Sequence, residues 1–330
     1  MPTADIAALI AAFCWSCANI AIARGSGGRG GDNGAFLSIL ITSAFAAVVW
    51  VAEASRRGWV VPTWAAIFWF ALAGALTIFI GRVFFHSSIQ WLGAVRGSSV
   101  KRLAPLFAVL LGVLMLGDPL TGPLVLGAGL IFAGFGVLVH ESLSSSAAAA
   151  RAGAGGQAAD AGGMRAWRAW VNPGLFFGAV SSLAYAAGNI ARKYGLHDMP
   201  DPAFGAMLGS LVGAFLYVVT AAFVDEYRTA VRNAFTRFNP WLLGAGVLAS
   251  AGQLLFFVAI DLGTVSRAAL IVSSEVFVTM AITYLLFRKR EPLTRAAVAA
   301  AVLGFAGTVV IMADAPAGNA PPAAAASPRP

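Results

Sequence analysis

The sequence predicts an all-α polytopic membrane protein with ten transmembrane helices in two inverted five-helix repeats. The first observation is the composition, which is 59% hydrophobic and only 11% charged, with a mean hydropathy of +0.81. Such a chain has too little polar surface to coat a soluble globule of this length. The second is that many apolar runs reach the roughly 20 residues that a helix needs to cross a bilayer. The third is an internal repeat.

The repeat is visible when the second half of the chain is shifted back by 170 residues. The matched features are an aromatic residue, an asparagine, a Leu-Gly pair and, after a three-residue insertion, an acidic residue before Pro-Leu-Thr. In order, these are Trp15/Tyr185, Asn19/Asn189, Leu92-Gly93/Leu262-Gly263 and Asp118–Thr121/Glu291–Thr294. Duplication in a strongly apolar chain is typical of transporters built from two repeats.

Ten apolar segments are predicted to span the membrane. They are residues 6–23, 34–53, 64–86, 97–117, 120–139, 173–195, 203–224, 241–262, 265–287 and 294–312. The first segment is kept as a span, and not taken as a signal peptide, because it lacks a basic start and its duplicate lies inside the chain. Five spans per repeat is an odd number, so the second repeat enters the membrane upside down relative to the first, and the substrate site is expected near the midplane between them.

The expected organisation is a first repeat over 1–140, a flexible linker over 141–171, a second repeat over 172–313 and a disordered tail over 314–330. The linker is rich in serine, alanine and glycine, and the tail is rich in proline and alanine. The net charge of +8 comes mostly from Lys and Arg between apolar runs, where they anchor helices at the headgroups. No basic stripe interleaved with aromatics is present, which argues against a nucleic-acid partner.

With the repeat in place, the chain resembles the EamA family of the drug/metabolite transporter superfamily. The best-matching segments are Ser99 to Val139 and Ala268 to Ile311, in which a helix ends at an acidic residue before Pro-Leu-Thr and the next helix carries a late Ala-Gly pair. The resemblance implies a secondary transporter in a bacterial inner membrane, with a central cavity lined by the first, third and fourth helices of each half and a more peripheral fifth helix. It also implies cytoplasmic termini, whereas the distribution of Lys and Arg favours the reverse orientation.

Glu275 is the most conspicuous polar residue, because it lies in the middle of a predicted span. An ionised carboxylate there is costly, so it is expected to be paired, protonated or facing water. It is a candidate for proton coupling, and the alternative is a structural ion pair with Lys101 or Arg102. These two cations are expected either to approach Glu275 in the cavity or to snorkel to the headgroups.

The other candidate cavity residues are polar or aromatic side chains within the spans. Arg82 and His86 share one helical face and are suited to a carboxylate or phosphate, with snorkelling as the alternative. Gln253 lies near the duplicate of Arg82. Asn19 and Asn189 either line the cavity or bond between helices. The aromatics one turn earlier in each repeat, Trp15 and Tyr185, are expected to wall the cavity.

Several motifs are excluded as functional signals. Gly25 to Gly30 matches a dinucleotide fingerprint but follows a membrane helix rather than a strand. Cys14 and Cys17 lack further cysteines or a nearby histidine, so no metal or redox site is expected. Gly205, Gly209 and Gly213 form a small-residue stripe suited to helix packing. No Walker loop or nucleophile–base constellation is found, and no cofactor is expected.

The predicted function is therefore transport of a small organic solute, anionic or zwitterionic because the candidate cavity residues lean cationic. A flippase for a lipid-linked metabolite is the nearest alternative, and a membrane enzyme is a more distant one. The substrate, the direction, the coupling ion, and a monomeric or homodimeric state stay open.

Overall fold

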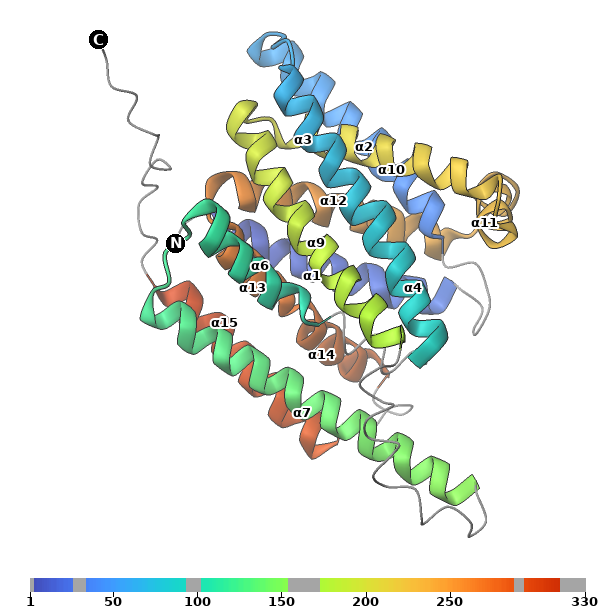
Figure 1. The fold of residues 1–330 in the computed structure, drawn as a ribbon, viewed down its shortest axis with the longest axis vertical. Coiled ribbons are helices and arrows are strands. Elements are labelled where there is room, and N and C mark those ends of the chain that lie inside the picture. The colour runs from blue at the N-terminus through green and yellow to red at the C-terminus, as the bar shows by residue number, and fades with distance from the viewer. Residues whose placement is uncertain (1–2, 26–33, 93–101, 154–172, 288–293, 315–330) are drawn as a thin grey trace.

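A computed structural model describes residues 3–25, 34–92, 102–153, 173–287 and 294–314 (Figure 1). In this part of the chain, nine helices are long and apolar enough to cross a membrane, and a shorter apolar helix covers Ala104–Leu116. The protein is a multi-pass integral membrane protein, and the predicted ten-helix, two-repeat fold class is confirmed.

The first repeat contains five spans, two of which include a π-helical turn. They are α1 (Thr3–Gly25), α2 (Ala35–Arg57), the continuous α3–η1–α4 (Trp64–Gly74, Ala75–Ile80 and Gly81–Leu92), α6–η2 (Ala104–Leu111 and Gly112–Leu116) and α7 (Gly122–Gly153).

The second repeat contains five further spans and one additional short helix. The spans are α9 (Pro173–Asp198), α10 (Pro202–Ala221), α12 (Pro240–Leu262), α13–α14 (Val265–Ser273 and Glu275–Phe287) and α15 (Arg295–Ala313), and the additional helix is α11 (Asp225–Thr236).

Local sequence explains where several of these helices begin. The side chains of Asp201 and Asn239 accept hydrogen bonds from backbone N–H groups of the first turns of α10 and α12, and each is followed by a proline. Thr63, Thr264 and Thr294 cap α3, α13 and α15 in the same way. These caps satisfy backbone donors that have no partner inside the helix.

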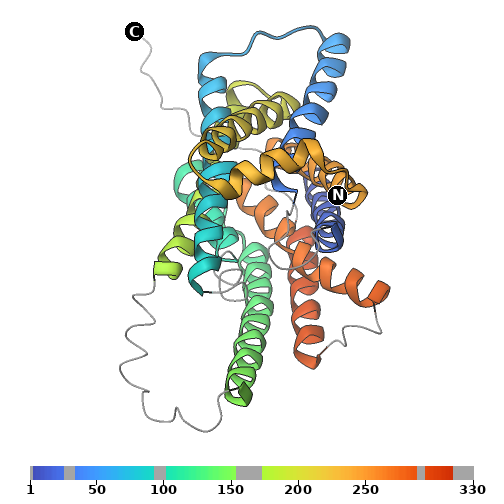
Figure 2. The same cartoon turned by 90° about the vertical axis from the view of Figure 1, so that its right-hand side faces the viewer.

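The two halves interlock by exchanged pairs of helices (Figures 1 and 2). Helix α1 packs on α12, and in return α9 packs on α3 and α4. Helix α2 packs on α10 and α12, and α6 packs on α13. The two fifth helices, α7 and α15, pair with each other along one edge of the molecule. Every contact from the first half thus has a counterpart from the second, as a pseudo-two-fold axis requires.

Three local features differ from the sequence-based expectation. Helix α7 continues to Gly153, so residues 141–153 are helical where a flexible linker was predicted; the alanine run from Ala147 favours helix. The fourth span begins at Ala104, and the earlier part of the predicted 97–117 lies mainly outside the described residues. Helix α11 was not predicted, because it is too polar to span a membrane. The linker from 154 and the tail from 315 also lie outside the described residues.

The glycine stripe of α10 packs against the third span of the same chain. A Cβ built on Gly74 of α3 would lie 2.2 Å from the carbonyl oxygen of Gly209, and one on Gly205 would lie 2.5 Å from Phe70. The two backbones approach so closely only because neither helix carries a side chain there.

We expect Gly74→Ala to destabilise the protein by about 1–3 kcal/mol, the usual cost of overpacking, since backbone atoms of α10 must move. Gly129→Ala is the matched control, because its Cβ would meet no atom within 4 Å. Thermal unfolding in detergent measures both variants. Equal melting temperatures for the two would contradict the close approach of α3 and α10.

Candidate functional site

A cavity of ≈ 690 Å³ lies between the two halves of the molecule. This volume is within the range of small-molecule sites, roughly 300–1,000 Å³. As expected, the first, third and fourth spans of both halves line it. Residues of α2, α7 and α10 contribute as well, which the sequence did not indicate; they are Ser38, Ile39, Thr42, Phe135 and Ser210.

The structure brings eight of the ten predicted site residues to this cavity. They are Trp15, Asn19, Arg82, Arg102, Tyr185, Asn189, Gln253 and Glu275. His86 belongs to α4, but its side chain is outside the described part of the structure. Lys101 lies entirely outside the described residues.

Glu275 begins α14, at a break in the ninth span. Helix α13 ends at Ser273, so Glu275 lies in the first turn of a new helix. Its Oε1 accepts a hydrogen bond from Asn19 Nδ2 at 3.2 Å, and its backbone carbonyl accepts one from Ser16 Oγ at 2.8 Å. The helix N-terminus and the amide donor both favour the ionised carboxylate. Glu275 is therefore held at a helix start and not in the middle of a continuous helix.

Two of the predicted cations have different surroundings. Arg82 donates a long hydrogen bond of 3.5 Å to the carbonyl of Ala35. The guanidinium of Arg102 lies 5.6 Å from the ring centroid of Phe135, and its Nη1 is buried with no hydrogen-bond partner among the described residues. Both side chains reach the cavity wall.

Arg192 on α9 is a third cavity cation, which the sequence analysis missed. Its side chain is buried, its Nη2 donates to Thr77 Oγ1 at 3.1 Å, and the rings of Phe257 and Phe256 lie 4.8 and 5.7 Å from the guanidinium carbon. A signal was present: Tyr185, Asn189 and Arg192 are spaced at i, i+4 and i+7, which is one face of a helix.

Aromatic side chains form much of the remaining wall. Trp15 donates from Nε1 to the carbonyl of Ala249 at 3.2 Å and meets the ring of Phe256 edge-on at 5.5 Å. The ring of Tyr185 packs against Gly81, where a Cβ would lie 3.0 Å from it. The cavity therefore combines apolar rings with three guanidinium groups and one carboxylate, and its charge is net positive.

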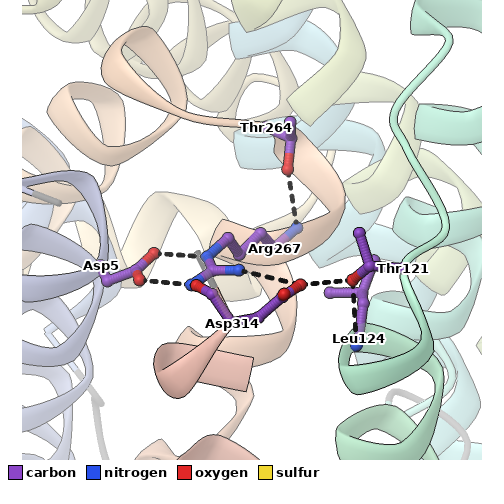
Figure 3. A network of polar contacts seen from close by, with 6 residues as sticks. All are labelled: Asp5, Thr121, Leu124, Thr264, Arg267 and Asp314. Carbon is purple, nitrogen blue, oxygen red and sulfur yellow. Dashed lines mark hydrogen bonds and ion pairs between the residues drawn. The ribbon is translucent and has the colours of Figure 1, made fainter. Parts of the chain in front are cut away.

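The end of the molecule that carries both termini is bridged by a buried ion-pair network (Figure 3). Arg267 of α13 binds Asp5 of α1 through two parallel hydrogen bonds of 2.8 and 2.7 Å, and its Nη2 donates to the carbonyl of Asp314 at 2.9 Å. The Asp314 carboxylate accepts a hydrogen bond from Thr121, next to α7. The side chains of Arg267 and Asp5 are only 11% and 2% exposed. Four helix ends are tied together here.

Further polar contacts bridge the same end. The Asp118 carboxylate accepts a hydrogen bond of 2.8 Å from the backbone N–H of Ser266, and the Tyr194 hydroxyl donates to the carbonyl of Met115 at 3.0 Å. Lys193 Nζ donates to three carbonyls at the end of α12, at 2.8 to 3.1 Å. The cavity-lining positions on α1 and α2, by contrast, lie in the halves of those helices nearer to α11.

Metal chemistry has no visible basis in the described residues. They contain no group of three His, Cys, Asp or Glu side chains placed to hold a metal ion, and Cys14 and Cys17 are free thiols.

Comparisons with known proteins agree with this architecture. The family described as the EamA-like transporter family matches residues 2–139 and 172–313. A solved structure titled only "Crystal structure of protein" aligns with a TM-score of 0.61 and 18% identity, over 94% of this chain and 99% of its own, which shows a shared fold. No curated protein matches the sequence significantly. Because the family match covers both halves, the chain belongs to the EamA-like transporter family.

Proposed function

We propose that this protein is a secondary active transporter that moves a small organic anion or zwitterion across the membrane by alternating access. The observation that carries the proposal is the net positive, aromatic-lined cavity between two inverted repeats. A midplane site at such a repeat interface is where transporters of this architecture hold their solute.

Alternating access requires one end of the cavity to close while the other opens. In the arrangement described above, contacts between the halves bridge the end that carries the termini. The complementary state would break these contacts and bring the opposite ends of the helices together. A pseudo-symmetric pair of repeats supports both states, because each half can adopt the conformation of the other.

The charge of the cavity supports an anionic or zwitterionic solute. A guanidinium offers a planar fork of donors that matches a carboxylate or a phosphate, and three of them face the cavity against one carboxylate. The membrane that holds the protein is proposed to be a bacterial inner membrane.

The direct test is solute flux. A thermal-shift screen of the purified full-length protein against metabolites identifies ligands, and proteoliposomes then measure uptake or exchange of the radiolabelled ligand. We expect protein-dependent flux of an anionic or zwitterionic compound. Ligands that are only lipid-linked, with no flux of any soluble solute, would favour a flippase instead.

Arg102→Gln is expected to weaken binding of this ligand by about 10-fold or more, the usual worth of a hydrogen bond to a charged group, while leaving the melting temperature nearly unchanged. Arg102→Lys should rescue binding only in part, because an ammonium cannot reproduce the planar fork. Arg232→Gln, on the exposed face of α11, is the matched control. Normal binding by Arg102→Gln would mean that Arg102 only packs over Phe135.

A further inference from the structure

Arg192 is buried without a charge partner. Its side chain is 5% exposed, and in the part of the chain that the structure describes no carboxylate lies within ion-pair distance of it. The faces of Phe256 and Phe257 compensate the charge in part, through cation–π attraction. A buried cation of this kind is costly unless its donors are used and an anion is present for at least part of the functional cycle.

The donors of Arg192 are only partly used. Nη2 gives one of its two hydrogens to Thr77 Oγ1, and Nε is buried with no hydrogen-bond partner among the described residues. The Thr77 hydroxyl itself donates to the carbonyl of Ala73 at 2.8 Å, so its lone pairs are directed at Arg192. Thr77 thereby orients the guanidinium and leaves the Nε edge available.

The same edge of a guanidinium binds a carboxylate elsewhere in this molecule. Arg267 holds Asp5 through Nε and Nη2, at 2.8 and 2.7 Å. Arg192 presents Nε and Nη2 in the cavity wall, where the chain supplies no such carboxylate among its described residues.

We propose that Arg192, oriented by Thr77 and flanked by Phe256 and Phe257, is the subsite that binds the carboxylate of the transported solute. The inference rests on the proposed function and deepens it by naming the charged group that the cavity selects and where that group binds. Asn189, one turn earlier on the same face of α9, also lines the cavity and is placed to contact the rest of the solute.

The subsite lies across the boundary between the repeats. Thr77 belongs to the π-helical turn η1 of the first repeat, and Arg192 belongs to α9 of the second. A π-helical turn inside a membrane helix is a frequent feature of functional sites. The repeat counterpart of Arg192 is Ile22, so the internal duplication does not supply a second copy. One carboxylate is therefore bound per cavity at this subsite.

The experiment measures discrimination between an acid and its uncharged amide. Full-length protein in detergent is titrated calorimetrically with two matched pairs, benzoate with benzamide and butanoate with butanamide. The variants are Arg192→Gln, Arg192→Lys and Thr77→Val, with Arg232→Gln as the control. Wild type and control should prefer the acid in at least one pair by about 10- to 100-fold.

Arg192→Gln should bring the acid-to-amide ratio close to unity, and Arg192→Lys and Thr77→Val should give intermediate ratios. A purely structural Arg192 would change the melting temperature and leave this ratio at its wild-type value, which would overturn the proposal. Absence of any acid preference in wild type would overturn it as well. If Arg192→Gln fails to fold, the other two variants decide: wild-type ratios in both would refute the subsite.

Failure of the subsite and failure of the proposed function are distinguishable. If the acid binds through Arg192 but proteoliposomes do not move it, the subsite stands and the transport proposal fails. If wild type moves the acid and the Arg192 variants keep the wild-type ratio, transport stands and the subsite is wrong.

Discussion

Glu275→Gln is expected to abolish accumulation of substrate driven by a pH gradient, while exchange of substrate for substrate continues. The reasoning is that a proton-coupled carrier needs an acid that binds a proton in one state and releases it in another, and Glu275 is the one carboxylate that lines the cavity in the described structure. Gln resembles the protonated form, so the proton cycle stops although the cavity stays intact.

The structure explains why this variant should fold. The amide oxygen of Gln can accept the hydrogen bond that Asn19 Nδ2 gives to Glu275 Oε1, and the bond from Ser16 goes to the backbone. Helix α14 loses only the attraction between an anion and its N-terminus, about 0.3–1 kcal/mol.

The measurement compares uptake into proteoliposomes with and without an imposed pH gradient, using the ligand found by thermal shift. Glu53→Gln is the control, since Glu53 is an exposed residue near the end of α2 and pairs with Arg57. Accumulation at the wild-type level by Glu275→Gln would exclude a coupling role. A variant that does not fold would instead make Glu275 a structural partner.

The second large effect is expected from Asp5→Asn, at the bridged end of the molecule. Breaking a buried ion pair by removing one partner costs about 3–5 kcal/mol, because the remaining charge is left buried. Arg267 keeps its contacts to Asp314, so we expect the lower end of this range. The cost falls on the state in which this end is closed, and the equilibrium should shift towards the state in which it is open.

A shift of about 3 kcal/mol corresponds to roughly a 100-fold change in the ratio of two states. The readout is thiol labelling of a cysteine introduced at the fully buried Ser266, in a background where Cys14 and Cys17 are replaced by serine. We expect Asp5→Asn to accelerate labelling strongly and to lower the melting temperature.

Asp225→Asn provides the comparison, because its pair with Arg228 is exposed on α11, and exposed pairs contribute at most about 1 kcal/mol. It should change neither labelling nor melting temperature by much. A lower melting temperature for Asp5→Asn with unchanged labelling of Ser266→Cys would show that the network stabilises the fold without acting as a gate.

The number of spans, the duplication and the fold class were predictable from the sequence. Each depends on local properties: the length of an apolar run, the position of a polar cap, and the parity of five spans per repeat. The same locality explains why Trp15, Asn19, Tyr185 and Asn189 could be proposed as cavity residues, since they are matched pairs on the first helix of each repeat.

The partners of the charged residues were decided only by tertiary structure. Arg267 counts as a loop charge in the sequence, yet it is buried against Asp5, 262 residues away. Arg192 lies near the end of a predicted span, but α9 continues to Asp198 and turns Arg192 into the cavity. A charge is tolerated inside such a protein when another helix brings it a partner or a polar cavity, and no local pattern records which helix that is.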